Sequence, residues 1–444
     1  MLLDTNTVSL TAGAALGGGL AVNYLNGGNS TGTADFTSLD LQGNQAIMDG
    51  SGNLSGFDSA IGGGGRLLGV ATVNYNGGTI SNNSAQTING SHAHGGGLAV
   101  EGDAVTGTYT SLNFQSNTAE VQGKGVDPGQ AVARGGGFFG LSQTGANSEA
   151  NFIQGSFTGN QAKATGADTS AMGGAAAILG NTDASFDGTS ITSNSAVADT
   201  GDAYGGALAF TEYLDLSDTP PVEAQPGSAE IKNANLSGNR AQAGNNAYGG
   251  AIFSRNDDLK VINGQLTGNS AGGTNAFGGA IFMDTADVVS DGGGTNARGA
   301  QALLTLEATT AKDVLLIQGN TANGQASGIH FGTTGGDSAV DGVLDITGAG
   351  TVKLLDPVTV ALNNGKDFTL TKNNTGKLQW GGANQFDTNG GSTYINLTRG
   401  TAYLTDDFSA GVGNAVSNTD FNVNLSGSTL AIDASRNANK AMFE

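Results

Sequence analysis

The feature that most restricts the fold of this chain is a pair of short motifs that recurs along it. One motif contains two adjacent glycines between small and apolar residues, and its two most similar copies are 247–253 and 276–282. Looser copies lie at 95–100, 135–140, 173–179 and 203–210. Self-similarity at a period of roughly 30 to 50 residues is typical of a solenoid, in which each repeat contacts only its neighbours. The sequence therefore predicts a stacked, elongated architecture.

The second motif places an apolar residue three positions before an asparagine and an alanine two positions after it. Asparagine tolerates the left-handed conformation that corners require, and its side chain can bond backbone groups that a bend leaves unpaired. We expect these side chains to lie at one corner of the stack and to form a ladder, with the alanine filling a site too small for a larger group. The predicted corner residues are Asn44, Asn83, Asn117, Asn160, Asn194, Asn239, Asn269 and Asn320.

Between these motifs, apolar and polar residues alternate over short segments such as 111–115, 304–307 and 343–347. Such alternation predicts short strands with one buried face. Helical periodicity is nearly missing, and Gly or Asn recurs too often for a long helix. The predicted fold is all-β, a single-stranded parallel β-helix (β-solenoid). The Gly-Gly pair would supply backbone with positive φ and no Cβ at a tight bend.

The motifs also suggest how the chain is divided. Residues 1–340 carry the repeats, with predicted loop excursions near 211–230 and 284–301. Residues 341–444 are expected to form further β-helix coils. We also interpret the variable spacer between Asn and Gly-Gly as surface excursions on one face. A coil of about 20 residues would give about 20 coils and a rod of roughly 100 Å.

Composition narrows the function classes. The chain has 76 glycines but only 5 prolines, and collagen needs both in abundance. With 37% apolar residues in alternating patterns, disorder is not expected. The 17 basic and 38 acidic residues give a net charge of −21, which repels nucleic acid and anionic membranes. We therefore expect no nucleic-acid partner.

The cysteine count agrees with export from the cell. The chain has no cysteine, so no disulfide would obstruct passage through membranes. No stretch approaches the roughly 20 apolar residues of a membrane helix, and the first residues lack the charged and apolar regions of a secretory signal. The expectation is that a signal and an anchor lie outside this sequence.

Both motifs resemble the repeats of the polymorphic membrane proteins, which are autotransporter adhesins. Phe114 with Asn117, and Phe157 with Asn160, match the Phe-x-x-Asn form of that family. The other copies carry Ile or Leu in place of Phe, and the early Gly-Gly copies change to Gly-Gly-Gly. The Gly-Gly-Ala form is matched at 205–208, 249–252 and 278–281.

A second resemblance lies near the C-terminus. Residues 368–404 are similar to the passenger-associated transport repeat of autotransporters, with departures at Gln379 and Trp380. Together the two resemblances imply a right-handed β-helical passenger on the surface of a Gram-negative bacterium. It would be anchored to the outer membrane or released from it. They also imply an outer-membrane β-barrel C-terminal to Glu444.

Candidate catalytic and metal-binding residues are few. Residues 336–339 resemble the nucleophile segment of serine-protease autotransporters but lack its last glycine, so a turn is the better interpretation. His92 and His94 would share one face of a strand, yet no Cys or carboxylate neighbour completes a metal site, and a solvated loop is expected. Asp284, Asp287, Asp291 and the charged turn at 255–258 show no paired spacing. We predict no catalytic residue, no metal and no cofactor.

The expected function is a non-catalytic adhesin or self-association rod. Its partner would be a host surface protein, a glycan or another copy of the chain. A candidate partner-binding loop within 211–230 carries Tyr213, Asp215 and Asp218. The alternative is a polysaccharide-acting β-helix enzyme or a tailspike-like depolymerase, which would use several carboxylates on one face. A third interpretation is a structural stalk that presents another domain.

Overall fold

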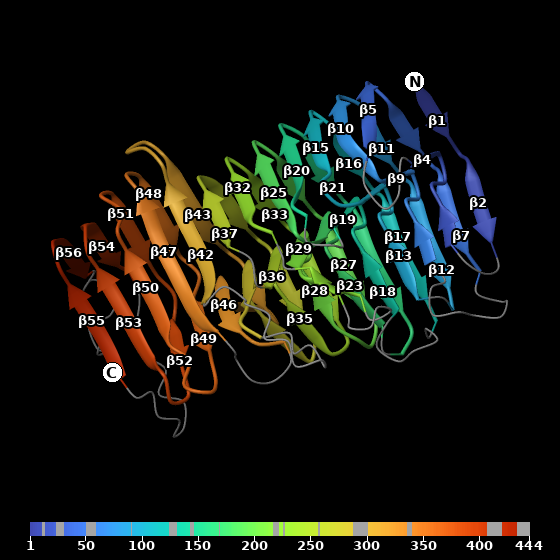
Figure 1. Ribbon diagram of the computed structural model, residues 1–444. Helices are drawn as coiled ribbons and strands as arrows, with labels where there is room; N and C mark the ends of the chain where they lie inside the picture. The colour runs from blue at the N-terminus through green and yellow to red at the C-terminus, as the bar shows by residue number, and fades with distance from the viewer. Residues whose placement is uncertain are drawn as a thin grey trace.

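The strands of this protein stack along one axis, from N-terminal strands in blue to C-terminal strands in red (Figure 1). The described ranges contain strands, turns and bends and no helix, hence none that could cross a membrane. The fold is an all-β parallel β-helix, as the repeats predict. The computed structural model describes residues 1–10, 14–23, 31–49, 59–89, 91–123, 131–142, 146–167, 169–215, 222–224, 227–255, 258–286, 301–334, 340–405 and 420–432.

Three parallel sheets of 12, 13 and 11 strands enclose the main core, and we call them the body. The 12-stranded sheet contains β5 (Thr31–Thr37), β10 (Val70–Asn76), β15 (Thr106–Thr110), β20 (Ser148–Ile153), β25 (Thr182–Asp187), β32 (Ala229–Lys232), β37 (Leu259–Ile262), β42 (Gln301–Ala308), β47 (Asp341–Gly348), β50 (Phe368–Lys372), β53 (Ser392–Leu397) and β55 (Asp420–Leu425). The 13-stranded sheet contains β1 (Leu2–Asp4), β6 (Asp40–Gln42), β11 (Thr79–Ser81), β16 (Asn113–Gln115), β21 (Ser156–Thr158), β26 (Ser190–Thr192), β33 (Asn235–Ser237), β38 (Gly264–Thr267), β43 (Val314–Gln318), β48 (Thr351–Leu354), β51 (Lys377–Trp380), β54 (Gly400–Leu404) and β56 (Ser428–Ile432). The 11-stranded sheet contains β4 (Leu20–Asn23), β9 (Gly65–Leu68), β14 (Leu98–Glu101), β19 (Phe138–Ser142), β24 (Ala176–Gly180), β29 (Leu208–Thr211), β36 (Ile252–Arg255), β41 (Ile281–Asp284), β46 (Ile329–Gly332), β49 (Val358–Ala361) and β52 (Gln385–Asp387).

Two further sheets, of 10 and 8 strands, form what we call the arm. The 10-stranded sheet contains β2 (Thr7–Leu10), β7 (Gln45–Met48), β12 (Ser84–Ile88), β17 (Thr118–Gln122), β22 (Gln161–Thr165), β27 (Ser195–Ala198), β34 (Arg240–Ala243), β39 (Ser270–Gly272), β44 (Thr321–Ala322) and β45 (Gln325–Ala326). The 8-stranded sheet contains β3 (Ala14–Leu16), β8 (Ser59–Ile61), β13 (His92–His94), β18 (Ala131–Arg134), β23 (Thr169–Met172), β28 (Ala203–Tyr204), β35 (Asn246–Tyr248) and β40 (Asn275–Phe277).

Each full coil passes through these five sheets in the order 12-, 13-, 10-, 8- and 11-stranded. Hydrogen-bonded corner asparagines in adjacent coils are 30 to 51 residues apart. The prediction of about 20 residues per coil is therefore wrong, because the two motifs mark two corners of one coil. The spacer between them holds the two arm strands as well as any loop. Thirteen strands in the longest sheet give a stack of roughly 60 Å at about 4.8 Å per coil.

The body and the arm have different interiors. The body encloses large apolar side chains such as Tyr75, Ile80 and Leu98. Its aromatic rings stack from coil to coil, as Phe114 and Phe157 do with ring centroids 4.5 Å apart. The arm interior is almost entirely alanine from its two sheets, so the sheets approach each other closely. The alanines that follow the corner asparagines from Asn117 to Asn269 belong to this second core.

The coil shape changes towards the C-terminus. Among the described residues, the 8-stranded sheet ends at β40, and the 10-stranded sheet ends at the antiparallel pair β44 and β45. The body sheets continue, so coils after Asp341 pass through three sheets instead of five. The change lies near the predicted boundary at residues 340 and 341, and the body sheets cross it without a break. The division into two domains stays a prediction.

The two glycines of the repeat have different roles. The first lies at positive φ in every full coil, for example φ 59° at Gly95 and 70° at Gly249. The second has no space for a side chain, because a Cβ on Gly96 would lie 2.3 Å from the backbone of Thr118. The expectation of positive φ therefore applies to the first glycine, and the second permits close approach of neighbouring coils.

The structure describes parts of both predicted excursions. Within 211–230, β30 (Tyr213–Asp215) and β31 (Val222–Ala224) form a separate antiparallel pair. For the second, Asp284 is the last residue of β41 and Gln301 is the first residue of β42. Residues 287–300, which include Asp287 and Asp291, lie outside the described ranges.

Candidate functional site

All eight predicted corner asparagines lie in one column at the corner between the 13-stranded and 10-stranded sheets. Their side chains are buried, with exposed fractions of 0 to 1%. The backbone N–H and Nδ2 of Asn83 both donate to Oδ1 of Asn117, at 3.1 and 3.0 Å. The same Nδ2 also donates to the carbonyl of Leu41 in the preceding coil at 2.8 Å. This pattern repeats from Asn44 to Asn269.

Two residues that the motif search missed extend the column. Asn6 donates its N–H and Nδ2 to Oδ1 of Asn44 at the N-terminal end. Asp356 accepts both donors of Asn320 at the C-terminal end. Asn6 has the apolar Leu3 three positions before it but Val8 in place of the alanine, so a looser motif would have found it. The column is a structural element, since its polar groups are buried and bonded to one another.

The three histidines are also part of the packing. His92 and His94 lie on β13 with their ring centroids 5.3 Å apart, on one face as expected. The prediction of a solvated loop is wrong, because a buried strand holds them. Burial and the nearby Arg134 lower the pKa of His92 to about 3, and the pKa of His94 is lowered in the same direction. Within the described residues, no group of three or more potential metal ligands is present.

Of the residues predicted as a charged turn at 255–258, Arg255 contributes to a buried ion-pair network. Arg255, at the end of β36, donates from Nε to Asp284 at 2.5 Å and from Nη1 to Glu212 at 3.0 Å. Asp284 is fully buried and also accepts from the N–H and the hydroxyl of Thr334. Although burial opposes it, these two carboxylates raise the pKa of Arg255. The network joins four segments of the chain and uses Asp284 as an anchor.

The predicted partner-binding residues are only partly placed. Tyr213 and Asp215 lie at the two ends of β30, which pairs with β31. Asp218 lies outside the described residues, as does the protease-like segment 336–339. The structure describes no site formed by these residues.

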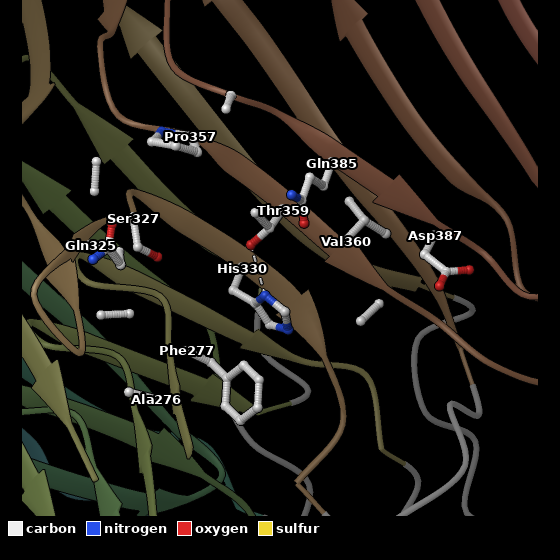
Figure 2. A pocket seen from close by; sticks show the side chains of 14 residues that line it. Ala276, Phe277, Gln325, Ser327, His330, Pro357, Thr359, Val360, Gln385 and Asp387 are labelled. Atoms are coloured by element: carbon white, nitrogen blue, oxygen red, sulfur yellow. Dashed lines mark hydrogen bonds between the residues drawn. The ribbon is translucent and has the colours of Figure 1, made fainter. Parts of the chain in front are cut away.

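A groove of about 850 Å³ lies where the arm ends and the body continues. Figure 2 shows Phe277 and His330 close together in it, with Gln385 and Asp387 further along. The groove was not anticipated from the sequence, because it arises from strands that are missing from a coil. It is lined by Ala276, Phe277, Ala322, Gln325, Ala326, Ser327, His330, Pro357, Thr359, Val360, Ala361, Ala383, Gln385 and Asp387.

His330 lines this groove, and contacts with neighbouring side chains hold its ring in place. Its ring centroid lies 5.0 Å from that of Phe277 and 5.3 Å from that of Phe282. Its Nδ1 lies 2.8 Å from Oγ1 of Thr359. Burial lowers the pKa of His330 to about 4, so the ring is neutral at pH 7.

The groove combines an aromatic face with polar groups. Phe277 is half-buried and offers a ring surface, while Gln325 and Gln385 are exposed and offer amide donors and acceptors. Asp387 supplies the one carboxylate among the lining residues, and no Lys or Arg is among them. This arrangement suits recognition of a ligand by stacking and hydrogen bonds.

Comparison with known proteins adds nothing to this geometry: no family model, no curated protein and no solved structure matches the chain.

Proposed function

We propose that this chain is the passenger of an autotransporter, displayed on the surface of a Gram-negative bacterium. It acts there as a non-catalytic rod that binds a host surface protein, a glycan or another copy of itself. The β-helical stack and the sequence resemblances at the repeats and at 368–404 support this proposal. The observation that carries the binding function is the groove at the end of the arm.

The outer faces of the body provide a second surface for self-association. Alternate residues of the 12-stranded sheet point away from the core, as Thr106, Thr108 and Thr110 do on β15. Such polar rows repeat from coil to coil and can form many weak hydrogen bonds with a matching surface. Charged residues are sparse at 12% of the chain, which lowers repulsion between two such faces.

The groove gives weaker support to a polysaccharide-acting enzyme. Glycoside hydrolysis commonly uses two carboxyl groups about 5 to 9.5 Å apart. Asp387 is the one carboxylate among the groove-lining residues, and the neighbouring His330 is buried and neutral. A binding function therefore fits this site better than hydrolysis.

The proposal is tested with bacteria that display the chain on their surface. We expect adhesion to host cells or cell-to-cell aggregation, and a marked loss of it in the double variant Phe277→Ala, Gln385→Ala. Asp199→Asn, at an exposed position that lies neither in the groove nor on the outer face of the 12-stranded sheet, is the matched control for adhesion. Absence of adhesion, of aggregation and of self-association in ultracentrifugation would refute the proposal.

A separate assay addresses the enzyme alternative. The purified protein is incubated with a panel of acidic polysaccharides, and products are measured. We expect no turnover. Product formation that is lost in Asp387→Asn would favour the depolymerase instead.

A further inference from the structure

A backbone hydrogen bond at the corner between the 8-stranded and 11-stranded sheets recurs from coil to coil. The series stops where the 8-stranded sheet ends. The N–H of the first repeat glycine donates to the carbonyl of the last 8-stranded-sheet residue in the next coil. Gly205 donates in this way to Tyr248 at 2.8 Å, and Gly249 donates to Phe277 at 2.9 Å. The donors of the series are Gly17, Gly62, Gly95, Gly135, Gly173, Gly205 and Gly249. Gly278 occupies the same position, but the coil that follows it has no strand in this sheet.

The strand is missing because the chain takes a shorter path in that coil. From Asn320 to Ile329 it uses fewer residues than from Asn269 to Ile281. It turns back in the pair β44 and β45 and then enters β46 directly. Thus β40 is the last strand of the 8-stranded sheet among the described residues, and Ala276 and Phe277 of this strand line the groove.

The edge of β40 presents backbone groups suited to another strand. Asn275 donates its N–H to the carbonyl of Asn245 at 3.1 Å, and Phe277 accepts from Gly249, so both residues bond towards the preceding coil. Hydrogen bonding alternates along a strand in a parallel sheet. The N–H and C=O of Ala276 therefore point the other way, into the groove, together with the N–H of Gly278.

The side chains of the sheet define what a further strand must carry. The middle residue of each strand in register is alanine and belongs to the arm interior, as Ala247 and Ala276 are. The next residue is large, and Tyr204, Tyr248 and Phe277 stack with ring centroids 5.4 and 5.7 Å apart. A ninth strand that fits would have a small residue followed by an aromatic one.

We propose that the groove binds an extended peptide of another protein, which adds to β40 as a parallel ninth strand of the 8-stranded sheet. This inference rests on the proposed binding function and names the partner chemistry of the same site. Strand addition at a free sheet edge is a common mode of peptide recognition, in which backbone bonds supply affinity and pockets for alternate side chains supply specificity. The small residue faces the alanine core, and the aromatic ring stacks on Phe277 beside His330. With Asp387 and no basic residue in the lining, the groove favours a neutral or basic peptide.

The probe is a labelled peptide with blocked ends and the sequence of residues 244–250, Gly-Asn-Asn-Ala-Tyr-Gly-Gly. We expect saturable binding to the purified chain in fluorescence anisotropy. Changing Tyr248→Ala in the peptide should weaken binding by about fivefold, the upper range for one cross-strand pair. Changing Ala247→Val should weaken it further, because the alanine core has no room for the added methyl groups.

Variants of the protein test the location. Ala276→Pro removes the free edge N–H and should abolish peptide binding, with the thermal transition as a check on folding. Phe277→Ala, which keeps the edge, should weaken binding by a similar few-fold factor to Tyr248→Ala in the peptide. Asn113→Ala, on an exposed face of the body, is the control and should bind as the original chain does.

The outcomes separate this inference from the proposed function. No peptide binding at millimolar concentration, or unchanged binding in a folded Ala276→Pro variant, would overturn strand addition. A neutral oligosaccharide that binds the groove while the peptide does not would also overturn it. If displayed cells still adhere in those cases, the adhesin proposal stands. If the peptide binds but the cells neither adhere nor aggregate, strand addition stands and the adhesin proposal fails.

Discussion

Asn320 donates its backbone N–H and its Nδ2 to the same carboxylate oxygen of Asp356, at 2.8 Å in both cases. The other carboxylate oxygen accepts the N–H of Gly319 at 2.9 Å. A carboxylate only accepts hydrogen bonds, whereas an amide must also donate. Asp356 therefore ends the column at a position where a further asparagine would leave an Nδ2 group facing the Gly319 donor.

The first prediction concerns this terminal residue. Asp356→Asn should lower the free energy of unfolding by about 1–3 kcal/mol, the cost of a buried polar group without a partner. Chemical denaturation measures the loss. The exposed Asp199→Asn is the matched control and should change stability by less than about 0.5 kcal/mol. Equal effects of the two substitutions would show that the carboxylate of Asp356 is not required.

The second prediction concerns the column interior. Asn239 donates to Asn269 twice and to the carbonyl of Ile191 once, and it accepts from Asn194. Asn239→Ala should destabilise the chain by about 1–3 kcal/mol, because it removes the oxygen that accepts from both the N–H and the Nδ2 of Asn194. Asn113→Ala, at an exposed site in the 13-stranded sheet, should have little effect. An unchanged melting curve for Asn239→Ala would contradict the buried ladder.

The third prediction compares the second repeat glycine of one coil, Gly206, with Gly268, which lies before the corner residue Asn269. Gly206→Ala should destabilise strongly, by more than about 3 kcal/mol, because its Cβ would lie 2.2 Å from the carbonyl oxygen of Gly250. In Gly268→Ala the added Cβ has no atom within 4 Å, so the only cost is the backbone strain of an alanine at a φ of 63°. Its cost should be about 1 kcal/mol. Thermal melts of the two variants compare close packing with backbone strain directly.

The fourth prediction concerns pH. The folded pKa of His92 is lowered to about 3 from 6.5, and that of His94 is also lowered, so the folded state favours neutral rings beside Arg134. Their contribution to stability is complete above the unfolded pKa and is lost as pH falls from 6.5 towards the folded values. Stability should therefore fall by up to about 1.4 kcal/mol per pH unit for each ring within that window.

This slope is best measured between about pH 7 and about pH 5, above the range in which carboxyl groups titrate. Glu101, whose pKa is raised by burial although Arg66 lowers it in part, acts in the opposite direction between its ordinary pKa and its raised one. The double variant His92→Gln, His94→Gln should have a shallower slope even if it is less stable overall. A slope equal to that of the original chain would exclude these rings as its source.

The sequence predicts the fold well because its signals are local and repeated. The asparagine and glycine positions mark real corners, and the alternation along 343–347 lies within β47. The coil size was misjudged because alanine is a weak indicator of burial. The arm strands with Ala93 or Ala247 at their centres appear as spacer in the sequence although they line a second core.

The candidate groove could not be predicted in this way. It arises because the coil after β40 has no strand in the 8-stranded sheet while the body coils continue. Phe277 and Gln385 therefore line one groove although more than one hundred residues of sequence separate them. No local pattern marks such a step. Likewise, the burial of His94 depends on Arg134 and Phe139 from the next coil, which contact its ring.

The asparagine column has a direction, and direction matters during assembly. Each rung holds its two donors towards the C-terminal neighbour and its oxygen towards the N-terminal one. A partial stack built from the N-terminus would always end in a pair of orphan N–H groups. A partial stack nucleated on Asp356 would instead end in a side-chain oxygen that accepts no hydrogen bond, which costs less free energy than unpaired N–H groups. Growth from the carboxylate towards the N-terminus is thus the smoother route, and the last amides to exchange with solvent should be those nearest Asp356.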